Sequence, residues 1–264
     1  MKYSTSVRNS RLETILYALG SILLLIVVWG LSVRYTALRK IMPSPTVVMT
    51  AIANAMVEPI GTHILPMHIL YSLRRVFIGY LLAVSIGIPI GIIMGCTKRG
   101  EAIIRPIFEL LRPIPGLAWI PLAILWFGIG ENSKYFIICI SASVSIILNT
   151  YEGAKSVDPM LVGAARMLGA SERHIFVLIT LPGSVPHIFA GLQVGLSSSW
   201  MAVIAAEMIR SGEGTGWIII TGMESGDTVQ ILVGMVSIGV VGLVLATLLR
   251  NLERRLCSWN IQGK

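Results

Sequence analysis

The chain has 264 residues, of which 55% are hydrophobic and 13% are charged, and its mean hydropathy is +0.80. Soluble domains carry about 25% charged residues, so this composition indicates a protein whose helices face lipid. The net charge of +8 does not indicate a nucleic-acid partner, because the basic residues gather at the ends of apolar segments. In membrane proteins, basic residues at these positions set the orientation of the spans.

The sequence predicts neither a disulfide nor a metal site nor a cofactor. Cys96, Cys139 and Cys257 lie far apart, and no Cys-x-x-Cys pair or Cys/His ligand spacing is present. The chain has no Gly-x-x-x-x-Gly-Lys-Ser/Thr loop for nucleotide phosphates, no Gly-x-Ser-x-Gly turn, no His-Glu-x-x-His pair and no convincing pair of carboxylates. We therefore expect no catalytic site.

Six apolar segments are long enough, or nearly so, to cross a hydrocarbon layer about 30 Å thick as helices. They are Ile15–Leu31, Val76–Met94, a third segment that ends near Gly128, Tyr135–Tyr151, His187–Ala206 and Thr228–Leu249. The first is longer than a typical signal-peptide core, and no clean cleavage site follows it, so we interpret it as a retained span. In the third, Arg112-Pro-Ile-Pro115 interrupts the run, which predicts a kink or break because proline removes a backbone donor.

The charges predict the orientation of these spans. With the N-terminus inside the cell, the inner segments hold 13 basic residues and the outer segments hold seven, with Arg112 assigned to neither side. Basic residues favour the inner side, so we expect six spans with both termini in the cytoplasm. The loop Ser211–Asp227 has three acidic residues and no Lys or Arg, which places it outside.

The expected organisation has four parts. They are an N-terminal tail and first span (1–40), an external segment (41–71), a core of five helices (72–250) with an inner loop (152–182), and a cytoplasmic tail (251–264). Apolar spacing in the external segment predicts a short helix over Thr46–Val57 at the outer surface. Arg74 and Arg75 begin the second span, where they either snorkel to the outer interface or line a polar entrance between subunits.

Two spans carry ridges of small residues. The ridge of the second span repeats every four positions and consists of Gly79, Ala83, Gly87, Gly91 and Gly95, and the ridge of the fifth consists of Gly191, Gly195 and Ser199. Small residues let helices approach closely in lipid, so we predict that these ridges pack against other spans and carry no chemistry.

The inner loop predicts two short helices joined at a glycine. Asp158-Pro159 is typical of a helix start, Gly169 of a helix end, and Ser171 begins the next helix. With Ala164 and Ala165 exposed, this segment would form a knob that inserts into a groove of a partner. The alternative is a solvated loop that only connects two spans.

This loop resembles the cytoplasmic signature of the membrane subunits of ABC importers, which reads Glu-Ala-Ala, three residues, Gly, nine residues, Ile-x-Leu-Pro. Gly163-Ala-Ala-Arg-Met-Leu-Gly169 and Ile179-Thr-Leu-Pro182 match six of its seven fixed positions. Five further segments within residues 40–250 look like permeases of the nitrate/sulfonate/taurine importer group: Met42-Pro-Ser-Pro-Thr46, Ser72-Leu-Arg-Arg-Val76, Arg112-Pro-Ile-Pro-Gly116, Leu125-Trp-Phe-Gly-Ile-Gly-Glu131 and Ala205-Ala-Glu-Met208.

The resemblance implies an all-α polytopic membrane protein with six transmembrane helices and the type I ABC importer transmembrane-domain fold, in a bacterial cell (inner) membrane. It implies two ATPase subunits, an extracellular or periplasmic solute-binding protein and a second permease copy in a homodimer. The residues implied to couple to the ATPase are Gly163, Ala164, Ala165, Arg166, Leu168, Gly169 and Ala170. Gly163 replaces the signature glutamate, so a salt bridge from that position is absent. The implied cargo is a small solute of the sulfonate, nitrate, taurine or vitamin-precursor class.

A polar and aromatic patch in the fifth span consists of Ser197, Ser198, Ser199, Trp200 and Met201. We expect it to line the translocation pathway, with interhelical hydrogen bonding as the alternative for the serines. A secondary transporter driven by an ion gradient is a second hypothesis, and a membrane-anchored scaffold is a third. The second would place an ionisable residue near the bilayer midplane, whereas Glu207 lies at the outer end of its span.

Overall fold

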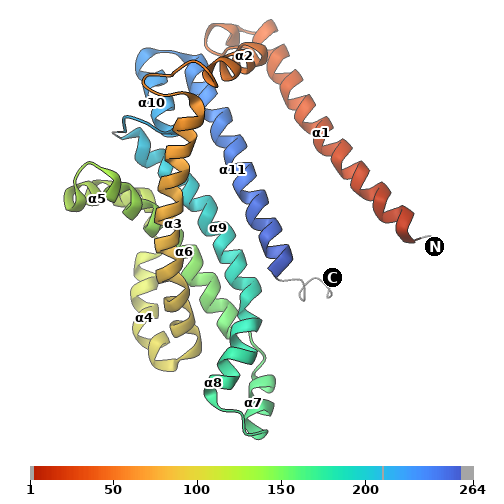
Figure 1. Ribbon diagram of the computed structural model, residues 1–264, viewed down its shortest axis with the longest axis vertical. Coiled ribbons are helices and arrows are strands. Elements are labelled where there is room, and N and C mark those ends of the chain that lie inside the picture. Colours follow the sequence, from red (N-terminus) through yellow and green to blue (C-terminus); the bar gives the residue numbers. More distant parts are fainter. Residues whose placement is uncertain (1–2, 210, 257–264) are drawn as a thin grey trace. The chain divides into compact units, whose positions relative to one another are not determined.

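The computed structural model describes residues 3–209 and 211–256, and these ranges are helical apart from loops and one isolated bridge between Ile60 and His63 (Figure 1). The chain divides into two compact units. Unit 1 comprises Met1–Leu65 and Ile218–Met235, and unit 2 comprises Pro66–Trp217 and Val236–Lys264. The predicted tail 251–264 begins as the last turns of a helix, and its part 257–264, which includes Cys257, lies outside the described residues.

Unit 1 contains α1 (Tyr3–Tyr35), a short 3-10 turn, η1 (Ala37–Lys40), and α2 (Pro45–Ala55). The indole nitrogen of Trp29 donates to the carbonyl oxygen of Pro43 at 3.2 Å, which ties the end of α1 to the start of α2. Ser44 caps α2 and proline occupies its first turn, as helix starts favour. The helix predicted over 46–57 is therefore confirmed, one residue earlier at its start.

Helices α10 (Thr215–Ser225) and α11 (Thr228–Leu256) meet at a tight turn within unit 1. Asp227 accepts hydrogen bonds from the amides of Val229 and Gln230 and so caps α11. The side chain of Gln230 donates to the carbonyl oxygen of Ile218 at 3.0 Å and to the hydroxyl of Thr221 at 2.7 Å. Most of the predicted outer loop 211–227 is therefore a helix, which these bonds hold against α11.

Unit 2 is a bundle of helices, with several short helical elements between the longer ones along the chain. They are α3 (Leu65–Cys96), α4 (Lys98–Leu111), the 3-10 turn η2 (Gly116–Trp119), α5 (Ile120–Phe127), α6 (Glu131–Lys155), α7 (Pro159–Met167), α8 (Glu172–Ile175), the π-helical turn η3 (Phe176–Thr180) and α9 (Leu181–Met208). The last part of α11 belongs to this unit as well.

The small-residue ridges pack on α6, as predicted. A methyl group added at Gly91 of α3 would lie 2.6 Å from the Cβ of Thr150 on α6, and one at Gly79 would lie 2.6 Å from that of Ile138. On α9, a methyl group at Gly191 would lie 2.8 Å from the Cβ of Asn149, also on α6. The absence of side chains at these positions lets both helices approach α6 closely.

The apolar core of unit 2 joins α3, α5, α6 and α9 through buried side chains that include Val76, Ala123, Ile138 and Val203. Trp200 of α9 belongs to this core, and its indole nitrogen donates to a backbone carbonyl oxygen of α11 at 3.1 Å. The core therefore extends from α6 through α9 to the part of α11 that belongs to unit 2.

Among the described residues, five helical stretches are long and apolar enough to cross a membrane. They are Leu16–Tyr35, Leu65–Cys96, Glu131–Lys155, Glu172–Met208 and Thr228–Leu256. The predicted third span is instead a pair of helical stretches, Lys98–Leu111 and Gly116–Phe127, bent by 85° at the Arg112–Pro115 break. The predicted break is confirmed, and six spans result when this bent pair is counted as one.

Candidate functional site

The predicted helices of the inner loop are present, and the expected residues begin and end them. The carboxylate of Asp158 accepts from the amide of Met160 at 2.8 Å and starts α7, with proline in its first turn. Gly169 follows the end of α7 with a φ of +81°, which is the left-handed conformation that glycine adopts readily. Ser171 then caps α8. These three local predictions are confirmed.

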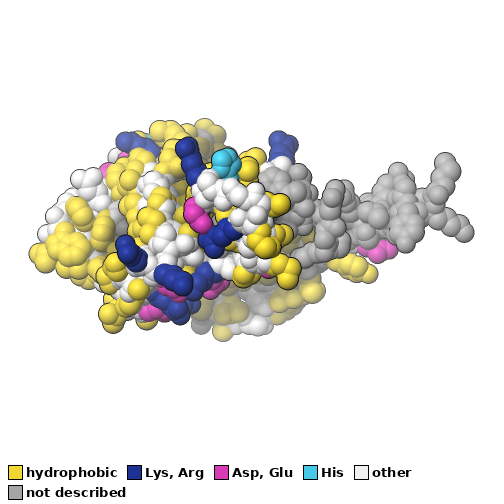
Figure 2. Space-filling view, turned by 90° about the horizontal axis from the view of Figure 1, so that it is seen from below, with side chains coloured by type: hydrophobic (Ala, Val, Ile, Leu, Met, Phe, Trp, Pro, Cys, Tyr) yellow, Lys and Arg dark blue, Asp and Glu magenta, His cyan; other side chains and the backbone are white. Residues whose placement is uncertain are grey.

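Four large apolar side chains of this segment are exposed: Met160, Leu161, Met167 and Leu168. Met167 is 86% exposed and Leu168 is 88% exposed, whereas Ala164 and Ala165 are half-buried. The prediction that the alanines form the exposed surface is therefore wrong. Residues seven apart return to the same face of a helix, so the spacing of the methionines and leucines indicates this face from the sequence. Figure 2 shows hydrophobic side chains beside Lys and Arg on this end of the molecule.

One ion pair closes the turn between α7 and α8. The guanidinium of Arg166 donates to both carboxylate oxygens of Glu172, at 2.9 and 3.1 Å. This hydrogen bonding raises the pKa of the Arg166 guanidinium above its usual value. Gly163 stands where the signature has glutamate. A methyl group there would meet no atom within 4 Å, so a side chain at this position would have room.

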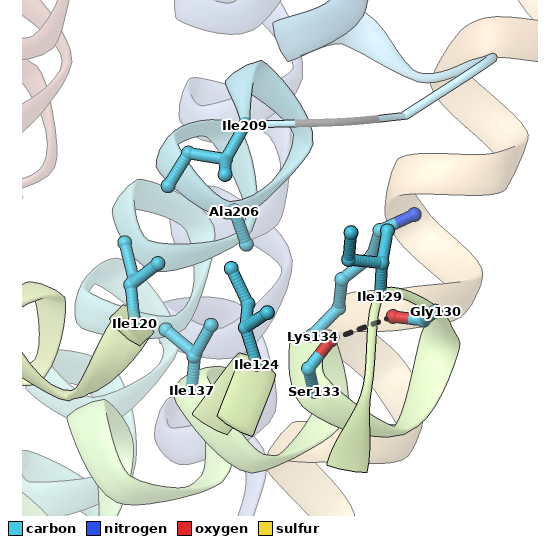
Figure 3. Close-up of a pocket in the computed structure, with 9 residues that line it drawn as sticks. All are labelled: Ile120, Ile124, Ile129, Gly130, Ser133, Lys134, Ile137, Ala206 and Ile209. Atoms are coloured by element: carbon cyan, nitrogen blue, oxygen red, sulfur yellow. Dashed lines mark hydrogen bonds between the residues drawn. The ribbon is translucent and has the colours of Figure 1, made fainter. Parts of the chain in front are cut away.

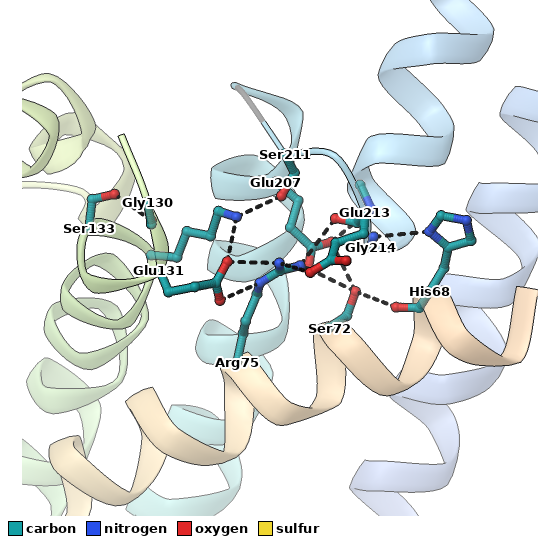
Figure 4. A network of polar contacts seen from close by, with 12 residues as sticks. His68, Ser72, Arg75, Gly130, Glu131, Ser133, Glu207, Ser211, Glu213 and Gly214 are labelled. Atoms are coloured by element: carbon teal, nitrogen blue, oxygen red, sulfur yellow. Dashed lines mark hydrogen bonds and ion pairs between the residues drawn. The ribbon is translucent and has the colours of Figure 1, made fainter. Parts of the chain in front are cut away.

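A second polar site lies in unit 2 around Arg75 of α3, whose side chain is 3% exposed (Figure 4). Its guanidinium donates to both carboxylate oxygens of Glu131 at 2.8 Å and to one carboxylate oxygen of Glu207 at 2.9 Å. It also donates to the backbone and side-chain oxygens of Glu213, at 3.1 and 3.0 Å. All five N–H donors of this arginine therefore have an acceptor.

Glu207 is fully buried near the end of α9, where its oxygens accept from several donors. The hydroxyl of Ser72 lies 2.9 Å from both carboxylate oxygens, and the amide of Gly216 donates at 3.0 Å. Gly214 has a φ of +111° and passes directly over this carboxylate, so that a side chain there would overlap it. A buried carboxylate is tolerated only when it is paired and hydrogen-bonded, which this arrangement achieves.

Lys134 and His68 extend the same network. The ammonium of Lys134 lies 2.8 Å from Glu131 and 2.7 Å from the hydroxyl of Ser211. The ring nitrogen Nδ1 of His68 accepts from the amide of Gly214 at 3.1 Å. The network thus joins α3, α6, α9 and the segment before α10. With every group ionised it holds three carboxylates and two cations. We call it the Arg75 network.

The sequence interpretation of Arg75 as a snorkelling or entrance-lining residue is wrong, since the side chain is buried among carboxylates of its own chain. Its neighbour Arg74 is exposed. The signal available in the sequence was that Arg75, Glu131 and Glu207 all fall at span ends, where buried charges require partners.

The predicted pathway residues divide between two environments. Ser197 and Met201 are exposed, and Ser198 is half-buried, whereas Ser199 and Trp200 lie in the core. The hydroxyls of Ser197 and Ser198 donate to backbone carbonyls of their own helix, at 3.2 and 3.0 Å. In the part of the chain that the structure describes, these two hydroxyls bond along their own helix and not to another helix. A cavity of about 200 Å³ lies where Ser197 and Met201 face α11.

A further cavity of about 270 Å³ lies between α5, α6 and α9 (Figure 3). Its walls are mostly isoleucine, and its polar groups are occupied: Ser133 donates to Gly130, and the ammonium of Lys134 belongs to the Arg75 network. Within residues 3–209 and 211–256, no group of three or more His, Cys, Asp or Glu side chains is placed to hold a metal ion.

Comparison with known proteins places this geometry among transport proteins. The profile of the family described as "Binding-protein-dependent transport system inner membrane component" matches residues 87–257. The chain is 39% identical over 241 residues to a putative ABC transporter permease protein of Methanocaldococcus jannaschii, with 89% of each chain covered. It is 38% identical over 193 residues to the taurine transport system permease protein of Escherichia coli, with 73% of this chain and 70% of the relative covered. It is 35% identical over 238 residues to a nitrate import permease protein of Synechocystis, with 88% of this chain and 86% of the relative covered.

Solved structures of lower identity share the fold. A chain of the inward-facing MetNI methionine ABC transporter has a TM-score of 0.59 at 21% identity and covers 74% of this chain and 94% of its own. A chain from the crystal structure of an amino acid ABC transporter with histidines has a TM-score of 0.61 at 15% identity and covers 82% of this chain and 99% of its own.

Proposed function

Because the chain belongs to the family of binding-protein-dependent transport system inner membrane components, we propose that two copies of it form the translocation pathway of one ATP-driven importer. The chain is a multi-pass inner-membrane permease with the fold of type I ABC importer transmembrane domains. Its core (72–250) contains the bundle around α6, and its inner loop (152–182) contains α7 and α8.

The proposed docking site for the ATPase is the apolar face of the α7–α8 segment, and this face carries the proposal. Met160, Leu161, Met167 and Leu168 are exposed together at a point where the chain leaves one span and enters the next. Exposed apolar patches on otherwise polar loops are typical of interaction sites. ATP hydrolysis belongs to the partner, one ATPase subunit for each permease copy.

The signature residues then have two kinds of role. Leu168 contacts the ATPase directly. Gly169 ends α7, and Arg166 fixes the turn to α8 through Glu172, while Gly163, Ala164, Ala165 and Ala170 are the small residues of the docking segment. A rigid, preformed knob transmits closure of the ATPase dimer to the spans, since a ligand shifts a conformational equilibrium only through its different affinities for the two states.

The proposed orientation places α7 and α8, together with both termini, in the cytoplasm, and the Arg75 network at the outer end. A solute-binding protein docks at that outer end and selects the cargo. Two of the relatives are named for taurine transport and nitrate import, so the proposed cargo is a small solute of the sulfonate, nitrate, taurine or vitamin-precursor class. Ser197, Ser198 and Met201 line the pathway, with Ser199 and Trp200 behind them.

The test of the docking site compares one substitution at two exposed methionines. Met167→Glu places a charge on the apolar face, and Met223→Glu places the same charge on α10. We expect Met167→Glu to abolish co-purification of the ATPase subunit and Met223→Glu to leave it intact, with normal membrane yield of both. Equal recovery of the ATPase with both variants would rule out the α7–α8 segment as the docking site.

A further inference from the structure

A groove in unit 1 lies where the end of α1 meets the start of α2. Its volume is about 580 Å³, and its lining includes Ile26, Leu31, Arg34, Arg39, Ser44 and Thr46. The hydrogen bond from Trp29 to Pro43 holds the two helices at this corner. Val33, which lines the groove, and Val48 of α2 are buried, with exposures of 5% and 1%. The groove is therefore a fixed feature of the corner.

The groove is apolar along α1 and basic at the end where α1 stops. Ile26 and Leu31 form part of the apolar wall. Arg34 and Arg39 are exposed at the basic end, and neither guanidinium has a carboxylate partner in the part of the chain that the structure describes. The sequence contains no Asp or Glu between Glu13 and Glu58, so this corner supplies no counter-charge of its own.

This polarity gradient matches the membrane interface. The apolar stretch 16–35 of α1 has a mean hydropathy of 2.3. Only 6% of it is buried inside the protein, so nearly all of its surface is free to face lipid. Its apolar wall therefore lies at the level of acyl chains, and Arg34 marks the level at which the helix leaves the hydrocarbon. The arginine stacks on the ring of Tyr35 at 5.7 Å, and aromatic residues favour this same level.

We propose that the groove binds one anionic phospholipid. The phosphate lies between Arg34 and Arg39, whose planar guanidinium groups match two phosphate oxygens at a time. The hydroxyls of Ser44 and Thr46 lie at the same end and donate to the headgroup. An acyl chain follows the wall along Ile26 and Leu31. The lipid supplies the missing counter-charge and fixes the angle at which α1 meets α2.

The experiment uses the full chain in detergent and measures retained lipid by native mass spectrometry, with titration of phosphatidylglycerol and of phosphatidylcholine. We expect one bound phosphatidylglycerol and a clear preference over phosphatidylcholine. The double variant Arg34→Gln/Arg39→Gln should weaken phosphatidylglycerol binding about 30-fold, which equals about 2 kcal/mol, since each basic group near an anionic lipid contributes about half of that.

The matched control is Arg250→Gln/Arg254→Gln on α11, which removes the same net charge from exposed positions elsewhere. It should bind phosphatidylglycerol as the unmodified chain does. Equal weakening by both double variants would overturn the proposal, because it would show that binding depends on the total charge of the protein and not on the groove. Arg34→Lys/Arg39→Lys keeps the charge without the planar fork and should give an intermediate affinity, which also excludes misfolding as the cause.

Two further outcomes would overturn the proposal in different ways. Binding of inorganic phosphate or of soluble glycerophosphoglycerol with similar affinity would show a free-anion site that does not use the apolar wall. Unchanged lipid binding together with loss of dimer in the Arg34→Gln/Arg39→Gln variant would show that a second copy of the chain covers the groove.

Discussion

Removing Arg75 should destabilise the permease far more than removing the arginine beside it. In Arg75→Leu, the carboxylate of Glu207 stays fully buried and loses its only close cation within the described residues, Glu213 loses its arginine partner, and Glu131 keeps only Lys134. Removing one side of a buried ion pair costs about 3–5 kcal/mol. Arg74 is exposed and forms none of these contacts, so Arg74→Leu should change stability by about 0.5 kcal/mol or less.

The assay is the fraction of purified protein that stays monodisperse on size-exclusion chromatography after heating, in one detergent for all variants. For a chain of this size, 1 kcal/mol corresponds to about 2–4 °C, so Arg75→Leu should lower the apparent midpoint by about 6–20 °C. Adding Glu207→Gln to Arg75→Leu should recover part of this loss, because the buried charge is then removed. An Arg75→Leu midpoint within about 2 °C of that of Arg74→Leu would refute the reasoning, as would a double variant with the summed loss of both single changes.

Three other substitutions test the packing and the orientation. Gly91→Ala should cost about 1–3 kcal/mol by overlap with α6, whereas Gly239→Ala on α11, where a methyl group meets no atom within 4 Å, should not destabilise; equal midpoints would contradict close packing of the ridge. Trp200→Phe removes the hydrogen bond to α11 and should lower stability by about 0.5–1.5 kcal/mol in the same heating assay; an unchanged midpoint would show that this bond contributes nothing. In a chain without native cysteines, an impermeant thiol reagent added outside intact cells should label Glu224→Cys and not Met167→Cys; the opposite pattern would reverse the orientation.

Local features of this fold follow from the sequence because their causes lie within a few residues. Asp158 starts α7 and Gly169 ends it through bonds to their immediate neighbours in the chain. The glycines of the second span likewise predict close packing, although the sequence does not say that the packed helix is α6. The break at Arg112–Pro115 follows from its prolines, but the 85° bend depends on how the two halves pack.

The parts that could not be predicted depend on contacts between distant residues. Arg75 has partners 56, 132 and 138 positions away, so its burial is set by the tertiary fold. The sequence shows charges at the ends of spans and leaves their pairing open. The exposed face of α7 is different, because the seven-residue spacing of Met160 and Met167 already favours that face in the sequence.

Reconstitution into proteoliposomes tests the central claim, that this chain is a permease whose energy comes from a partner ATPase. The purified chain alone should neither hydrolyse ATP nor accumulate solute against its gradient when a proton or sodium gradient is imposed. Addition of the cognate ATPase subunits and the loaded solute-binding protein should confer both activities, with hydrolysis stimulated by the loaded binding protein. Uphill uptake by the chain alone, driven by a proton or sodium gradient, would contradict the account and identify a secondary transporter.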